Sequence, residues 1–116
     1  DVTALHDLNS LLLASQTPHA TIIVINNNGG GIFRRLPISQ HEPPFTDRFL
    51  TPHGRTFEHA AAMFGLDYRR AESREQFEQA VATAVTNPAP RLIELFTDGA
   101  QDEQIRKAIN TAVRTA

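Results

Sequence analysis

The feature that most constrains the fold is the run Thr21–Ile25, in which every residue after the first is apolar and most are β-branched. Such a run, without polar alternation, is typical of a strand buried on both faces of a parallel sheet. It stops at Asn26–Gly31, three asparagines followed by three glycines. Asparagine and glycine accept left-handed backbone angles, so the sequence predicts a buried strand that ends in a tight loop.

Helical and strand-like patterns alternate along the rest of the chain. Leucines at three- and four-residue spacing predict an amphipathic helix over residues 3–15 with Thr3 as its N-cap. A weak strand is predicted over residues 66–70 and a stronger one over 92–96. Further helices are predicted over residues 57–64, 73–86 and 100–115, with caps at Thr56, Ser73 and Asp98.

This alternation of helices and strands is typical of βαβ units and predicts an α/β fold, a parallel-sheet sandwich with helices on both faces. Only about three strands are visible in 116 residues. Such a sheet normally has more, so we expect its neighbours to lie outside the chain. We therefore treat residues 1–116 as a single partial domain of a longer protein.

Composition excludes several classes of function. The net charge of −2 provides no basic field for nucleic-acid binding. No apolar run reaches the roughly 18 residues of a membrane helix, and the absence of cysteine excludes disulfides and thiolate metal sites. No signal peptide is visible, so we expect a cytoplasmic protein.

The stretch Pro37–Arg55 carries four prolines and Gly54. Its length and its few periodic apolar residues predict a mobile surface loop.

The Asn-Gly loop is the strongest candidate for a binding site. Ligands of open α/β sheets bind beyond the carboxyl ends of strands, and an amide oxygen suits a hard cation such as Mg²⁺. Asp1 lies 26 residues before Asn27, so its carboxylate could meet the amide at adjacent strand ends. The alternatives are an ordinary strand-to-loop turn and, for Asp1, a capping or solvated residue.

The spacing of Asp1, Asn26, Asn27 and Gly29 resembles the Gly-Asp-Gly…Asn-Asn motif of thiamine-diphosphate enzymes, with Val2 in place of the second glycine. Within those enzymes the chain most resembles the MenD family, the 2-succinyl-5-enolpyruvyl-6-hydroxy-3-cyclohexene-1-carboxylate synthases of menaquinone biosynthesis. The blocks that carry this resemblance are Asp1–Asn9, Asn26–Pro37 and Phe57–Phe64. It implies that the chain is the C-terminal part of the thiamine-diphosphate-binding fold.

The resemblance also implies roles for individual residues. Asp1 and Asn27 would give side-chain oxygens, and Gly29 its backbone carbonyl, to the Mg²⁺ or Mn²⁺ that holds thiamine diphosphate. Ile32, Phe33 and Leu36 would lie beside the thiazolium and the substrate. Ile32 would contact the cofactor as well as the substrate. From spacing alone, these three could equally form a hydrophobic turn tucked into the core. No catalytic residue is implied here, because the family's activating glutamate belongs to another domain of a partner subunit.

The full-length enzyme would then be a transferase that decarboxylates 2-oxoglutarate and adds the succinyl unit to isochorismate. We expect it to be a homo-oligomer, a dimer or tetramer, without nucleic-acid or membrane partners, and we expect the isolated fragment to be inactive. Two alternatives from other classes are a non-catalytic phosphate-binding α/β module and a subunit-assembly domain that uses helix 3–15 or the last helix.

Other polar residues favour plainer interpretations. The five histidines lack the spacing of a zinc site. Arg34 and Arg35 could steer an acidic substrate, but adjacent arginines usually form a solvated surface. Glu94 lies within the apolar strand 92–96 and is either a buried functional carboxylate or, as we favour, an edge residue with one wet face.

Overall fold

The computed structural model describes residues 1–115, which divide into two compact units. The sheet unit comprises residues 1–26 and 55–96. The loop unit comprises residues 27–54 and the chain from Thr97 onward. Each unit is described by itself below.

The sheet unit is built on three parallel strands, β1 (Thr21–Asn26), β2 (Asp67–Ala71) and β3 (Arg91–Phe96), in the order β1-β3-β2. The register places Ile93 of β3 opposite Ile23 of β1 on one side and Arg69 of β2 on the other. The predicted strands and their parallel pairing are therefore confirmed, and β3 is the central strand.

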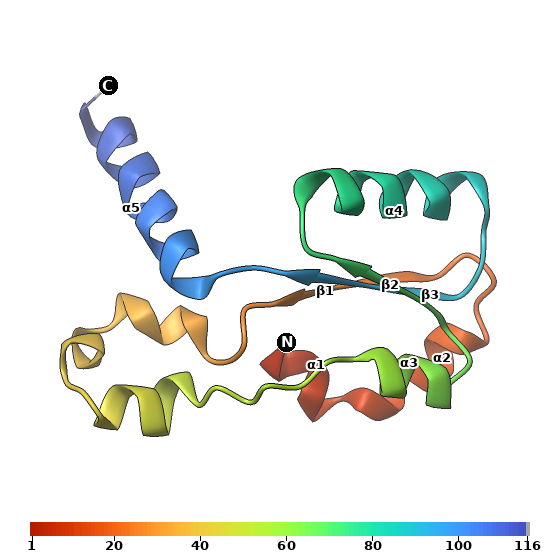
Figure 1. The fold of residues 1–116 in the computed structure, drawn as a ribbon, viewed down its shortest axis with the longest axis horizontal. Coiled ribbons are helices and arrows are strands. Elements are labelled where there is room, and N and C mark those ends of the chain that lie inside the picture. Colours follow the sequence, from red (N-terminus) through yellow and green to blue (C-terminus); the bar gives the residue numbers. More distant parts are fainter. Residues whose placement is uncertain (116) are drawn as a thin grey trace. The chain divides into compact units, whose positions relative to one another are not determined.

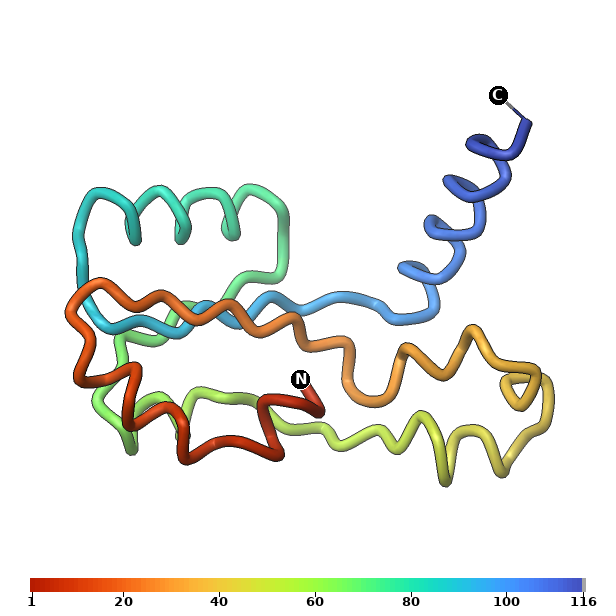
Figure 2. The backbone as a smooth tube through the Cα atoms, turned by 180° about the vertical axis from the view of Figure 1, so that it is seen from behind, coloured from red at the N-terminus to blue at the C-terminus, as the bar shows by residue number. Residues whose placement is uncertain are grey.

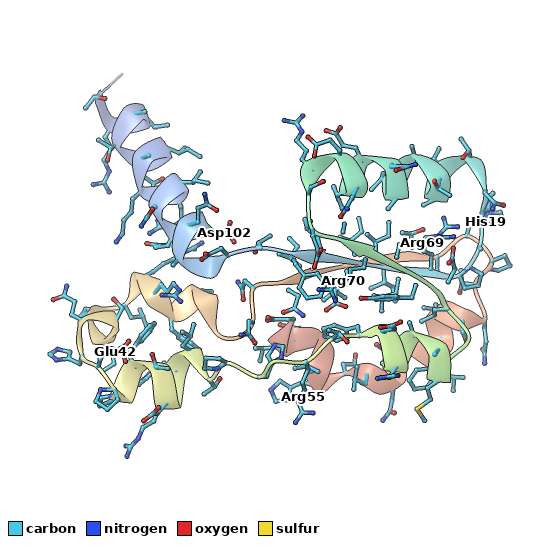
Figure 3. The ribbon with its side chains drawn as sticks, viewed as in Figure 1. His19, Glu42, Arg55, Arg69, Arg70 and Asp102 are labelled. Carbon is cyan, nitrogen blue, oxygen red and sulfur yellow. The ribbon has the colours of Figure 1, made fainter. Side chains whose placement is uncertain are left out.

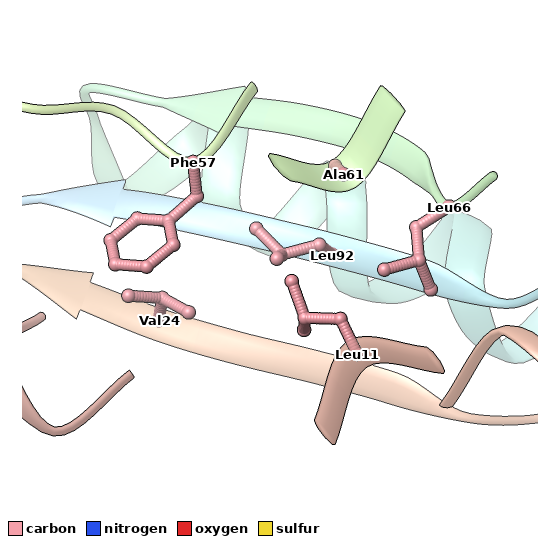
Figure 4. Close-up of a cluster of buried hydrophobic side chains, with 6 residues drawn as sticks. All are labelled: Leu11, Val24, Phe57, Ala61, Leu66 and Leu92. Carbon is pink, nitrogen blue, oxygen red and sulfur yellow. The ribbon is translucent and has the colours of Figure 1, made fainter. Parts of the chain in front are cut away.

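Helices cover both faces of this sheet, as predicted (Figure 1). On one face lie α1 (Val2–His6), the 3₁₀ helix η1 (Leu8–Ser10), α2 (Leu11–Ser15) and α3 (Glu58–Met63), and α4 (Arg74–Thr86) lies on the other. The core between the sheet and the first group of helices is shown in Figure 4; its buried members are Leu11, Val24, Phe57, Ala61, Leu66 and Leu92. Burial of these side chains is what holds the helices to the sheet.

The predicted continuous helix over residues 3–15 is broken. Asp7 leaves helical geometry, with φ −129° and ψ 44°, and separates α1 from η1. The Ser10 hydroxyl donates to the Asp7 carbonyl (2.7 Å). Such local bonding by short polar side chains competes with helix geometry. The N-cap of α1 is Asp1 and not Thr3.

The other predicted caps have mixed outcomes. Ser73 caps α4 by accepting from the Gln76 amide (3.3 Å), as predicted, although the Gln76 side chain accepts from the amide of Glu72 (2.8 Å). Thr56 does not cap α3, because the N-cap position falls on Phe57.

Burial alternates along β1, which contradicts the prediction of a strand buried on both faces. Val24 and Asn26 are buried, whereas Ile23 and Ile25 are 48% and 55% exposed. The reason is the strand order: α4 packs on β2 and β3, and β1 is an edge strand among the described residues.

In the loop unit, residues 27–54 run out and back (Figure 2). Short helical turns fill this excursion: η2 (Gly31–Arg35), η3 (Pro37–Gln40) and the π-helical turn η4 (Thr46–Leu50). The stretch 37–55 is thus partly helical where a plain loop was predicted. The burial of Phe45 in this stretch was not predicted from the sequence. Phe45 is 2% exposed, and the Arg34 guanidinium lies 5.9 Å from its ring centroid.

The last helix, α5 (Gly99–Thr115), belongs to the loop unit. Asp98 caps it as predicted, since its carboxylate accepts from the amides of Ala100 (2.8 Å) and Gln101 (3.1 Å). Within residues 1–115, no helix has the length and apolar character needed to cross a membrane.

Candidate functional site

Asp1 lies at the carboxyl end of β1 in the sheet unit. Its α-nitrogen donates to the carbonyl oxygen of Ile25 (2.9 Å), and its Oδ1 accepts from the amide of Val2 (2.5 Å). The second bond makes Asp1 the cap of α1, which is the capping alternative considered for it. The first bond fixes its backbone to the strand residue that stands two positions before Asn27.

The Asn-Gly turn, residues 27–31 of the loop unit, has an unusual backbone. Asn28 has φ 62° and Gly29 has φ 135°. A Cβ on Gly29 would lie 2.1 Å from the carbonyl oxygen of Leu50, and one on Gly30 would lie 2.3 Å from that of Phe49. The turn therefore requires glycine at both positions, because the returning chain packs directly against its backbone.

Asn27 carries the most informative atom of this turn. Its Oδ1 is buried and, within the described residues, has no hydrogen-bond partner. A buried acceptor without a partner costs about 1–3 kcal/mol, so such an atom calls for an explanation, of which a bound ion is one. An amide oxygen held in this way is suited to a divalent cation such as Mg²⁺.

A polar cavity of about 370 Å³ in the loop unit includes Asn27. The rest of its lining comes from η2 and the start of α5: Gly31, Ile32, Arg35, Gly99, Asp102, Glu103 and Arg106. Its charges are largely paired, since Glu103 bonds to Arg106 and lies 4.0 Å from Arg35. The bond from Arg106 lowers the pKa of Glu103. The cavity therefore offers no excess of positive charge for an acidic substrate.

Three apolar side chains follow the turn on η2 and just after it. Ile32, Phe33 and Leu36 are 66%, 38% and 46% exposed. Phe33 makes an edge-to-face contact with Phe49, with ring centroids 5.8 Å apart. The alternative in which the three are tucked into a core is not what the structure shows.

Glu94 is fully buried on the central strand β3, so its predicted place at a wet sheet edge is wrong. Its Oε1 accepts from the Asn26 side chain (2.6 Å), and its Oε2 accepts from the Phe57 amide (3.0 Å) and the Tyr68 hydroxyl (2.6 Å). Burial raises the pKa of Tyr68, and the hydrogen bond to Glu94 raises it further. Glu94 thus joins β1, β2 and the start of α3.

Asn26 uses the same side-chain nitrogen to reach the carbonyl oxygen of Arg55 (2.9 Å). Arg55, labelled in Figure 3, is the first residue of the sheet unit after the excursion 27–54. Sequence reasoning singled out neither Asn26 as a structural residue nor Tyr68. The available signal for a buried Glu94 was the apolar residues on both sides of it. A nearly continuous apolar run is typical of a strand that is buried on both faces.

The two arginine side chains of β2, Arg69 and Arg70, form ion pairs at the surface of the sheet unit (Figure 3). Arg69 pairs with Asp67 at 3.2 Å, and Arg70 pairs with Glu72 at 2.5 Å while stacking over the ring of Phe96 at 4.2 Å. Arg69 and Arg70 therefore form exposed ion pairs, which contribute little to stability. Within residues 1–115, no group of three or more histidine, aspartate or glutamate side chains is placed to hold a metal ion.

Comparison with known proteins identifies the family. Residues 1–95 match the sequence model of the C-terminal TPP binding domain of thiamine pyrophosphate enzymes. The chain belongs to the thiamine pyrophosphate enzymes. The α/β fold with its parallel sheet agrees with that domain, and the resemblance drawn from the motif residues is confirmed at this level.

Relatives of the chain carry the same name in several organisms, 2-succinyl-5-enolpyruvyl-6-hydroxy-3-cyclohexene-1-carboxylate synthase. The one from Roseiflexus castenholzii is 47% identical over 98% of this chain, and the one from Roseiflexus sp. (strain RS-1) is 44% identical over all of it. The one from Salinibacter ruber is 43% identical, again over the whole chain. The chain spans about a fifth of the length of these curated relatives.

Proposed function

We propose that the chain is the C-terminal part of the diphosphate-binding domain of a longer thiamine-diphosphate-dependent synthase of menaquinone biosynthesis. In this proposal the longer enzyme releases CO₂ from 2-oxoglutarate and transfers the remaining succinyl unit to isochorismate, a transfer of the aldehyde/ketone class. The observation that carries the proposal is the buried Oδ1 of Asn27, which has no hydrogen-bond partner among residues 1–115, in a chain whose residues 1–95 match the family.

The chain's share in this function is to hold the metal and the diphosphate. Asp1, Asn27 and Gly29 would give one carboxylate, one amide and one backbone oxygen to Mg²⁺ or Mn²⁺, a set of hard ligands that these cations prefer. The buried Oδ1 of Asn27, which has no partner among residues 1–115, supports this set.

The apolar residues that follow the turn would form part of the pocket. Thiamine diphosphate, when bound, supplies the stabilisation of the carbanion that decarboxylation of a 2-oxo acid requires. Ile32, Phe33 and Leu36 would exclude water beside it, and their exposure in this chain supports that role. No residue of the chain acts as the activating acid, which we assign to a glutamate of another domain in a partner subunit.

We further propose that the longer enzyme is a cytoplasmic homo-oligomer, a dimer or tetramer. The exposed apolar stripe of α5, formed by Ile105, Ile109 and Val113, supports an association surface. The light-scattering mass of the full-length enzyme tests this, and a monomer would contradict it.

The direct test of the metal assignment is Asn27→Ala in the full-length enzyme. Loss of one oxygen ligand is expected to weaken binding of Mn²⁺ and thiamine diphosphate at least about tenfold in calorimetry. Asn87→Ala, at an exposed asparagine after α4, is the matched control and should bind as the parent does. Equal affinity of the Asn27 variant and the parent would refute the assignment.

A second experiment separates this function from an autonomous phosphate-binding module. The isolated chain of residues 1–116 is expected to show no synthase activity and no micromolar binding of thiamine diphosphate with Mg²⁺. In the isolated chain the rest of the enzyme is not present to hold the metal-binding residues in place. Ordering them on binding therefore costs free energy and lowers the affinity. Micromolar binding by the isolated chain would favour the module.

A further inference from the structure

Asn28, the residue after the proposed metal ligand, is held in a specific conformation within the loop unit. Its backbone is left-handed, with φ 62°. Its Oδ1 accepts from two backbone amides of the returning chain, those of His53 (3.1 Å) and Gly54 (2.7 Å). One side-chain oxygen thus joins the turn to a segment 25 and 26 residues away in sequence.

A second set of contacts joins the same two pieces of chain through the backbone. The amide of Gly30 donates to the carbonyl oxygen of Leu50 (2.7 Å). The absence of a Cβ at Gly29 is what lets Leu50 approach, since that atom would lie 2.1 Å from the Leu50 oxygen. The returning segment, residues 49–54, therefore lies against the turn along its length.

These contacts are made by Asn28 and Gly30, which are adjacent in sequence to the two residues that the proposed function assigns to the cation, Asn27 and Gly29. Metal ligands bind tightly when neighbouring groups fix their orientation before the ion arrives. A run of asparagine and glycine has high conformational freedom by itself, so something outside the run must supply that order.

We propose that Asn28 is a positioning residue that orders the metal-binding turn by fixing it to the returning segment 49–54. The proposal rests on the function proposed above. Asn28 itself gives no ligand: it acts through the backbone of the turn, which carries Asn27 on one side and Gly29 on the other. Removing its side-chain acceptor should therefore weaken metal binding without removing a ligand.

The choice of variants follows from the backbone angle. Asn28→Gly deletes the acceptor, and glycine adopts φ 62° without strain. Asn28→Asp keeps a side-chain oxygen at the same position, and aspartate also tolerates left-handed angles. Asn87→Gly makes the same replacement at the exposed end of α4 in the sheet unit and serves as the matched control.

The experiment measures Mn²⁺ binding in the presence of thiamine diphosphate, by calorimetry and electron paramagnetic resonance, in the full-length enzyme. Asn28→Gly is expected to lower the affinity about 10–100-fold, the range typical when a residue that orients a ligand is lost. Asn28→Asp should stay within about threefold of the parent on the same reasoning, and Asn87→Gly should equal it.

Hydrogen exchange gives a readout that does not depend on the metal. The amides of His53 and Gly54 should exchange faster in Asn28→Gly than in the parent, while those of β3 should not change. Parent-like affinity in Asn28→Gly, or an equal loss in Asn28→Asp, would overturn the positioning role. If Asn27→Ala itself binds Mn²⁺ as the parent does, the proposed function fails and the positioning role fails with it.

Discussion

Two buried polar groups of the chain, the Glu94 carboxyl in the sheet unit and the Asn27 amide in the loop unit, have opposite surroundings. Glu94 accepts three hydrogen bonds from Asn26, Phe57 and Tyr68. Asn27 Oδ1 has no partner in the part of the chain that the structure describes. The Glu94 carboxyl has its hydrogen bonds supplied by the sheet unit, and the Asn27 amide is the group that we propose as a metal ligand.

The difference contrasts a polar group that stabilises the fold with one that we propose to bind a ligand. A satisfied buried group rigidifies its surroundings, whereas an unsatisfied one lowers stability until a ligand arrives. Substitution should therefore lower stability strongly at Glu94 and not at Asn27, with the reverse order for metal affinity. The following predictions test this contrast.

The largest loss of stability is expected for Glu94→Ala. It leaves the Phe57 amide and the Tyr68 hydroxyl without their acceptor, removes one of the two acceptors of the Asn26 side chain, and opens a cavity in the central strand. The expected cost is about 3–5 kcal/mol in the free energy of unfolding. Urea unfolding followed by circular dichroism measures it. Glu72→Ala, at an exposed glutamate paired with Arg70, is the control and should cost less than about 1 kcal/mol.

A smaller loss is expected for Gly29→Ala in the loop unit. The new Cβ would collide with the Leu50 carbonyl oxygen, and a non-glycine residue would be strained at this positive φ. Together these effects should lower the free energy of unfolding by about 1–3 kcal/mol. Gly54→Ala is matched to it, because Gly54 also has positive φ (60°) but open space where its Cβ would lie. Faster hydrogen exchange of residues 49–54 in the first variant only would support the close packing; equal effects would contradict it.

Tyr68 provides a test that depends on pH. Its pKa is raised above the ordinary value of 10, so its contribution to stability is complete below pH 10 and is lost as the pH rises through the folded-state pKa. Tyr68→Phe should lose about 1 kcal/mol at neutral pH and should lack this alkaline decline. Tyr68 is the only tyrosine of the chain, so tyrosinate absorbance follows it alone. Ordinary titration near pH 10 would show that the hydroxyl is not bonded to Glu94.

The smallest loss of stability is expected for Asn27→Ala in the isolated chain. Its Oδ1 has no hydrogen-bond partner among residues 1–115, so removing it breaks no hydrogen bond and relieves its burial cost. The free energy of unfolding should not fall, and it should rise by at most about 1–3 kcal/mol. A loss above about 1 kcal/mol in urea unfolding would mean that Asn27 belongs to the same class of residue as Glu94.

Local pattern was sufficient to predict most of the elements. The β-branched run of β1, the Ser73 cap of α4 and the Asp98 cap of α5 depend on residues close in sequence, and all three were predicted. The broken first helix was missed because leucine spacing indicates which face is apolar. It does not show that the polar residues around Asp7 interrupt the helix.

What the sequence could not supply is long-range pairing. Glu94 was misplaced because its apolar neighbours indicate burial of the strand but do not show that β3 lies between β1 and β2. Asn27 and Gly29 were selected by motif spacing, and their role as ligands stays a prediction. The contacts of Asn28 with His53 and Gly54 depend on how residues 27–54 fold back, which spacing alone does not encode.

The hydrogen bond from Asn26 to Arg55 has a consequence for how this family can change in evolution. It joins the two residues that bracket segment 27–54, so that segment leaves and re-enters the sheet unit at one fixed point. Insertions or deletions within it would lengthen or shorten a closed loop, and each doubling of loop length costs only about 0.6 kcal/mol in closure entropy. Homologues should therefore tolerate gaps between residues 37 and 44, before the buried Phe45, while keeping a donor at position 26.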